Sequence, residues 1–90
     1  MGVPEDINWL KSGEDQWGRV FRIIAEHGRP LWFRQLKHKL RAPEWWSVKS
    51  FVELLMERGL VEHTDSGLTL TEHGRKVFEA MRTTEELEAV

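Results

Sequence analysis

The sequence predicts a mainly helical α+β domain with one small β-hairpin, in the order helix, short strand, helix, helix, strand, strand, helix. Three observations carry this prediction. Apolar residues recur at helical spacing in three segments, Gly and Pro stand at the ends of those segments, and two short β-prone runs flank an Asp-Ser-Gly turn. A chain of 90 residues makes one domain with a modest core.

The first long helix is expected after Ser12, which resembles an N-cap because Asp15 follows three residues later. Gly28 ends this helix and Pro30 prevents its continuation. Its apolar face has the spacing i, i+3, i+4, i+7 and consists of Trp17, Val20, Phe21 and Ile24. Residues 1–11 are expected to form an N-terminal arm or a short helical turn, with Ile7, Trp9 and Leu10 as possible anchors.

Two further helices are expected in the middle of the chain. Residues 31–33 are too few for an independent element and are expected to pair as a short edge strand. A helix over 34–40 follows, and its apolar side consists of Phe33, Leu36 and Leu40. Pro43 then suits the first position of a helix over 43–58, which Gly59 ends. The apolar face of that helix consists of Trp45, Val48, Phe51, Val52 and Leu55.

A hairpin and a last helix complete the predicted domain. Residues 60–64 and 68–70 read as strands, joined by a three-residue turn with Gly67 where positive φ is required. Thr71 is expected to cap the last helix, which carries Val77, Phe78 and Met81. The domain therefore spans 12–82, and residues 83–90 form an acidic C-terminal tail or a helix extension, with Thr83 and Glu86 as a possible cap.

The positive charge of the chain is concentrated in one segment, although the net charge is −2. Residues 29–49 contain six basic residues and one acidic residue, so the rest of the chain is acidic. On the helix over 34–40 the spacing i, i+3, i+4, i+7 gives a basic stripe of Arg34, Lys37, His38 and Arg41. This asymmetry favours a surface that faces a polyanion, and the alternative is a solvated helix face.

Two helices with a tight break and a hairpin make a helix-turn-helix with a wing. The run Val52-x-x-Leu55-x-x-x-Gly59-Leu60-Val61, followed by Leu68-Thr69-Leu70-Thr71-x-x-Gly74, resembles winged helix-turn-helix transcriptional regulators of the MarR, ArsR and PadR kind. The resemblance covers about residues 15–82. It implies that the first motif ends a recognition helix and that the second leaves the wing. Such regulators are typically dimers.

The function predicted from this reading is duplex DNA binding by a transcriptional regulator. The helix over 34–40 would lie on phosphates, and the start of the helix over 43–58 would enter the major groove. Candidate DNA-binding residues on the latter are Trp46, Ser47, Lys49, Ser50 and Glu53, where Glu53 either accepts from a cytosine amino group or is solvated beside Lys49. The hairpin departs from the family because it has Asp65 and no Lys or Arg.

Alternative functions remain open at this stage. Trp9, Trp32 and Trp46 fall outside the expected core, which favours a homodimer through the N-terminal arm or the last helix, or a winged-helix protein-interaction module without DNA binding. Exposed Trp also suits single-stranded nucleic acid. With no Cys and four scattered His, no metal, cofactor or catalytic motif is expected, and the protein is not expected to be an enzyme. No apolar run is long enough to span a membrane, so we expect a cytoplasmic protein.

Overall fold

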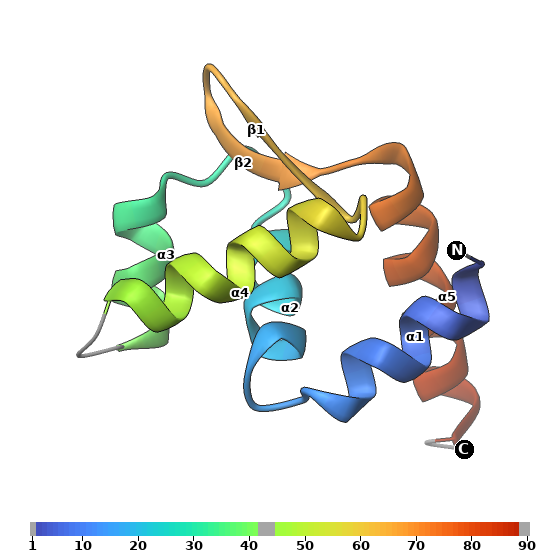
Figure 1. Cartoon of the computed structure of the whole chain (residues 1–90). Coiled ribbons are helices and arrows are strands. Elements are labelled where there is room, and N and C mark those ends of the chain that lie inside the picture. Colours follow the sequence, from blue (N-terminus) through green and yellow to red (C-terminus); the bar gives the residue numbers. More distant parts are fainter. Residues whose placement is uncertain (1, 42–44, 89–90) are drawn as a thin grey trace.

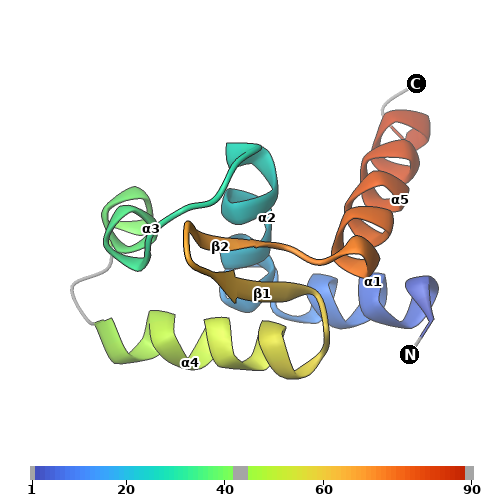
Figure 2. The same ribbon diagram turned by 90° about the horizontal axis from the view of Figure 1, so that it is seen from above.

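The computed structural model describes residues 2–41 and 45–88 (Figure 1). It is mainly helical with a small two-stranded antiparallel hairpin, as the sequence predicts for the fold class. In chain order the elements are α1 Val3–Ser12, α2 Trp17–His27, α3 Phe33–Leu40, α4 Trp45–Glu57, β1 Val61–Thr64, β2 Gly67–Leu70 and α5 Glu72–Glu88. Helix α2 lies in the centre, with α3 on one side and α1 and α5 on the other, while α4 runs past α2 from the α3 side to the base of the hairpin (Figure 2).

The N-terminal segment is a ten-residue helix, so the arm or short helical turn expected for residues 1–11 is wrong. Helix α1 packs against α2 and α5, and it buries Leu10 completely. Ser12 is not the N-cap of α2 either, because it ends α1 and donates from Oγ to the Trp9 carbonyl at 2.6 Å. Val3, Ile7 and Trp9 pack against the core beside Leu10, so the helix is held by partners that are distant in the sequence.

The predicted apolar faces of the three middle helices form the core. Val20, Phe21 and Ile24 of α2 are buried, as are Leu36 of α3 and Leu55 of α4. Trp17, Phe33, Leu40 and Phe51 pack against this core while partly buried. Glycines end α2 and α4 as predicted, since Gly28 and Gly59 have φ of 74° and 77°. Pro43 and the side chain of Trp45 lie outside the described residues, so the expected start of α4 at residue 43 is not tested.

The hairpin differs in detail from the prediction. Thr64 pairs with Gly67, so the turn contains two residues rather than three. Gly67 has φ of 124° and its backbone lies against that of Leu31, where a Cβ atom would not fit. The short strand expected at 31–33 is a single bridge, because Leu31 exchanges two 2.8 Å backbone hydrogen bonds with Leu68 and Phe33 already begins α3.

The last helix starts as predicted, and it continues into the segment that was expected to be either an acidic tail or a helix extension. The Gly74 amide donates to Thr71 Oγ1 at 2.9 Å, so Thr71 caps α5. Helix α5 continues to Glu88, and Thr83 bonds the carbonyl of Glu79 inside it rather than capping a new helix. The Arg22 guanidinium pairs with Glu85, which fixes this extension to α2. Within 2–41 and 45–88, no helix is long and apolar enough to cross a membrane.

Candidate nucleic-acid interface

The basic stripe of α3 lines one open depression on the molecular surface. This hollow has a volume of about 530 Å³, and its lining residues are Arg34, Lys37, His38 and Arg41. Leu36 on the opposite side of the helix is fully buried, which turns the basic side chains outward. Arg41 follows the last turn in a left-handed conformation with φ of 52°, and its amide donates to the His38 carbonyl. The four residues therefore form one cationic surface, as their spacing predicts.

Positive charge extends from α3 toward the end of α2. Burial lowers the pKa of His27 below its ordinary value of 6.5, and the charges of Lys39 and Arg29 lower it further. Lys39 is near enough to His27 for its charge to act there, and it is not among the residues that line the depression. The lowered pKa keeps His27 largely neutral at pH 7, so this residue adds little repulsion to the basic region.

Helix α4 presents a mixed polar and aromatic face to solvent. Val48, Val52 and Leu55 are buried, which leaves the opposite face exposed. Trp46 is 55% exposed at the start of this helix. Lys49, Ser50 and Glu53 are exposed, and Ser47 is half-buried. All five candidate residues of α4 thus lie at the surface, while Figure 1 shows the start of α4 at the same end of the molecule as α3.

The hairpin carries negative charge instead of basic residues. Glu62 and Asp65 are exposed, and no Lys or Arg occurs between residues 61 and 70. Thr64 holds the turn by donating from Oγ1 to the Gly67 carbonyl at 2.8 Å. A surface of this charge would be repelled by phosphates. Any polyanion seated on α3 would therefore be directed toward α4 and away from the hairpin tip.

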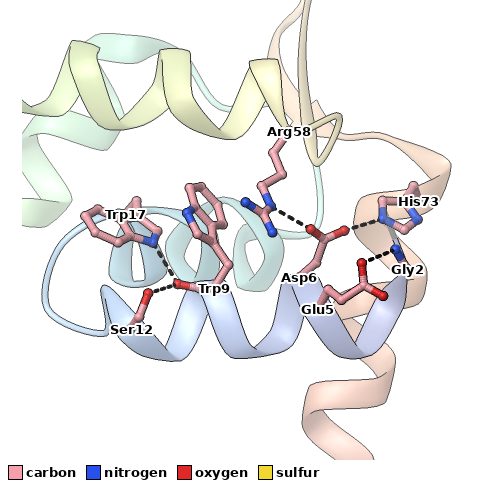
Figure 3. A network of polar contacts seen from close by, with 8 residues as sticks. All are labelled: Gly2, Glu5, Asp6, Trp9, Ser12, Trp17, Arg58 and His73. Carbon is pink, nitrogen blue, oxygen red and sulfur yellow. Dashed lines mark hydrogen bonds and ion pairs between the residues drawn. The ribbon is translucent and has the colours of Figure 1, made fainter.

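One polar cluster was missed by the sequence analysis (Figure 3). The Asp6 carboxylate is completely buried and accepts hydrogen bonds from Arg58 Nε at 2.7 Å and from His73 Nε2 at 2.6 Å. It joins α1 to the C-terminal end of α4 and to the first turn of α5. The only sequence signal is the position of Asp6, three residues before Trp9 and four before Leu10. This spacing places all three on the same helix face.

Aromatic rings extend this cluster toward α2. Trp9 stacks on Trp17 with ring centroids 5.5 Å apart, and the Arg58 guanidinium lies 4.5 Å from the centroid of Trp9. Trp17 Nε1 donates to the Trp9 carbonyl at 2.9 Å. The expectation that Trp9 lies outside the core is therefore wrong. These contacts hold the C-terminal end of α4 in place, and Trp46 lies at the opposite end of the same helix.

Comparisons with protein-family models, with curated proteins and with solved structures found no match to this chain. Among the described residues, no group of three or more His, Cys, Asp or Glu side chains is placed to hold a metal ion. His73, one of the four histidines, bonds Asp6. The candidate functional site therefore consists of the exposed surfaces of α3 and of the start of α4, which lie at the same end of the molecule.

Proposed function

We propose that this chain binds duplex DNA as a winged helix-turn-helix domain, with α3 as the first helix, α4 as the recognition helix and β1–β2 as the wing. The observation that carries the proposal is the gathering of Arg34, Lys37, His38 and Arg41 around one open depression on α3, the helix that Figure 1 shows at the same end of the molecule as the start of α4. Basic side chains on one surface of an acidic protein are the electrostatic footprint of a polyanion partner.

In this proposal α3 positions the domain on the DNA backbone. Arg34 and Arg41 are exposed at the two ends of the helix, and Lys37 lies between them. Guanidinium groups bind phosphate oxygens in pairs, and lysine adds a flexible point charge. Such contacts supply affinity but no sequence preference. Lys39 and Arg29, whose charges both act on His27, add further positive charge near this surface.

Helix α4 supplies the contacts that distinguish bases. Its N-terminal turns enter the major groove in a helix-turn-helix complex. Ser47, Lys49 and Ser50 donate hydrogen bonds to bases or phosphates, and Glu53 accepts from a cytosine amino group. The ring of Trp46, half exposed at the leading end, suits the methyl group of thymine. In this proposal the acidic wing stays away from the phosphates. The protein would therefore regulate transcription through DNA contacts of α3 and α4 alone.

Fluorescence anisotropy with a labelled random-sequence duplex tests the proposal. If Arg34, Lys37 and Arg41 each neutralise one phosphate, affinity falls about 40-fold between roughly 50 mM and 200 mM salt. This fall is the expected result because each phosphate contact releases condensed counterions. An absence of binding at both salt concentrations, in a protein whose circular dichroism shows it to be folded, would overturn the proposal.

Exposed apolar side chains on the same helix support a second candidate, a protein-interaction module. Trp46, Leu54 and Met56 of α4 are 55%, 38% and 41% exposed. Exposed large apolar side chains are enriched at protein interfaces, and each of these three is available to a partner. This candidate predicts that a partner protein binds at α4 with little dependence on salt. The same anisotropy experiment separates the two, since an interaction module gives no salt-sensitive duplex binding.

A homodimer is also part of the proposal, through α1 or α5. These helices pack against each other, so only their outer surfaces are available to a second chain. Leu87 near the end of α5 is 73% exposed and is the apolar residue that a dimer would cover. Light scattering after size exclusion is expected to give twice the monomer mass, and Leu87→Lys is expected to return the monomer.

A further inference from the structure

An exposed tryptophan stands at each end of the basic helix α3. Trp32 directly precedes this helix and is 50% exposed. Trp46 is the second residue of α4, which follows α3 after residues 41–44, and it is 55% exposed. Trp9 and Trp17, by contrast, pack against the core. The fold therefore leaves two large aromatic rings at the surface, at the two ends of the helix that carries the basic stripe.

The backbone that carries Trp32 is held on both sides. Before it, Leu31 exchanges two backbone hydrogen bonds of 2.8 Å with Leu68 of the hairpin. After it, the Trp32 amide donates to Gln35 Oε1 at 2.9 Å, and the Trp32 carbonyl accepts from the Leu36 amide at 3.0 Å. Leu31 and Leu36 are fully buried, so these anchors belong to the core. The indole is thus displayed from a fixed position, which lowers the entropy lost when a flat ligand stacks on it.

Between the two tryptophans, α3 supplies positive charge that the fold does not use. Arg34, Lys37 and Arg41 form no ion pair with any residue that the structure describes. Arg58, by contrast, is paired with Asp6. Helix α3 has eight residues and is therefore about 12 Å long. Along this length the basic side chains line the open depression of about 530 Å³, so a flexible polyanion can follow the helix from one indole toward the other.

We propose that this surface also binds single-stranded nucleic acid, with unpaired bases stacked on Trp32 and Trp46 and phosphates on the cations between them. Bases in a duplex are stacked on each other and offer only their edges, whereas every unpaired base offers an aromatic face. A cationic groove combined with exposed aromatic rings holds single strands without sequence preference. An apolar protein partner suits the surface less well, because it would bury Arg34, Lys37 and Arg41 unpaired. The inference goes beyond duplex binding and does not depend on it, since Trp32 has no role in the duplex proposal.

Fluorescence anisotropy of the full chain with a labelled oligothymidylate of about 15 nucleotides tests the inference, because this strand does not pair with itself. Saturable binding is expected, and three phosphate contacts predict a fall in affinity of about 20-fold between roughly 50 mM and 200 mM salt. An abasic strand of the same length keeps the phosphates and removes the bases, so it is expected to bind at least about tenfold more weakly. Oligouridylate is expected to bind as well as oligothymidylate, since the contacts engage bases and phosphates and not the sugar.

Substitutions of Trp32 separate stacking from charge. Trp32→Ala is expected to weaken oligothymidylate binding at least about fivefold and to leave duplex binding unchanged, with circular dichroism as the check on folding. Trp32→Phe keeps an aromatic face and is expected to retain most of the affinity, whereas Trp32→Leu keeps only an apolar side chain and is expected to behave like Trp32→Ala. Equal affinity of the Phe and Leu variants, or an equal loss of single-strand and duplex binding in Trp32→Ala, would overturn the inference. Duplex binding without oligothymidylate binding would also overturn it and would leave the proposed function intact.

Discussion

The buried carboxylate of Asp6 and the side chain of Arg58 form a 2.7 Å hydrogen bond between residues 52 positions apart. This contact ties α1 to the C-terminal end of α4, and His73 Nε2 at 2.6 Å adds α5 to the same carboxylate. Arg58 also lies over the ring of Trp9. Three helices are therefore held by one acidic residue, and the position of the candidate recognition helix depends on it.

Asp6→Asn is expected to destabilise the protein by about 2 kcal/mol. The amide keeps the size of the side chain but loses the negative charge that strengthens the hydrogen bonds of Arg58 and His73. Urea unfolding followed by tryptophan fluorescence measures the effect. The matched control is Asp65→Asn at the exposed hairpin turn, where the midpoint is expected to stay within error. Equal midpoints for the two variants would show that the cluster contributes no stability.

The stability of the wild-type protein is expected to depend on Asp6 at acidic pH. Burial opposes ionisation of this carboxyl, but the hydrogen bonds and charges of Arg58 and His73 outweigh burial and hold its pKa below 3.8. The unfolded chain consequently binds the proton more readily. The contribution of Asp6 is complete above the unfolded value of 3.8 and is lost as pH falls through the lower folded value.

Urea unfolding of the wild type and Asp6→Asn across this pH range checks the sign. The difference in free energy of unfolding between the two proteins is expected to shrink as pH falls below 3.8. A difference that grows on acidification would mean that the folded protein holds Asp6 in its protonated form.

Charge reversal on α3 is expected to abolish duplex binding. Arg34→Glu with Arg41→Glu places two negative charges at the basic depression, where phosphates are proposed to lie. The matched control is Lys76→Glu with Arg82→Glu, which makes the same charge change on exposed residues of α5. Anisotropy at low salt is expected to show binding by the control and none by the α3 variant. Equal loss in both variants would mean that net charge, not the α3 surface, governs binding.

Trp46→Ala is expected to weaken duplex binding about tenfold while leaving stability nearly unchanged. The side chain is half exposed at the leading end of α4, so a base contact is lost and little core packing is removed. Trp32→Ala is the control, because that ring is 50% exposed at the start of α3 and is assigned no base contact in the duplex. Anisotropy and urea unfolding on both variants separate the loss of a DNA contact from the loss of stability.

Gly74→Ala is expected to destabilise the protein by about 3 kcal/mol, although alanine is the better helix former. A Cβ atom there would lie under 3.0 Å from the backbone oxygen of Leu60, at the place where α5 meets the end of the α4–β1 connection. Gly28→Ala, at a left-handed position with open space around it, is expected to cost only about 1 kcal/mol. Thermal unfolding by circular dichroism compares the two, and similar losses would contradict a steric role for Gly74.

The secondary structure of the middle of this protein was predictable from local patterns in the sequence. The apolar faces of α2, α3 and α4, their glycine stops, the hairpin and the Thr71 cap are local patterns that physical chemistry reads from spacing alone. The basic stripe on α3 follows from the same periodicity, because four residues at i, i+3, i+4 and i+7 share a helix face in any surroundings. These features were predictable because each depends on residues within about two turns of one another.

The other features depend on contacts between segments that are distant in the sequence, and they became visible only in the tertiary structure. Helix α1 has a short apolar pattern in Val3, Ile7 and Leu10, but the buried Asp6 on the same helix depends on Arg58 and His73, which lie 52 and 67 positions away. The cavity between the end of α2, β2 and α5 likewise brings together residues that no local sequence pattern connects. A buried charge and a cavity between elements both depend on segments that pack together. The spacing of residues within one segment does not show which distant segment packs against it.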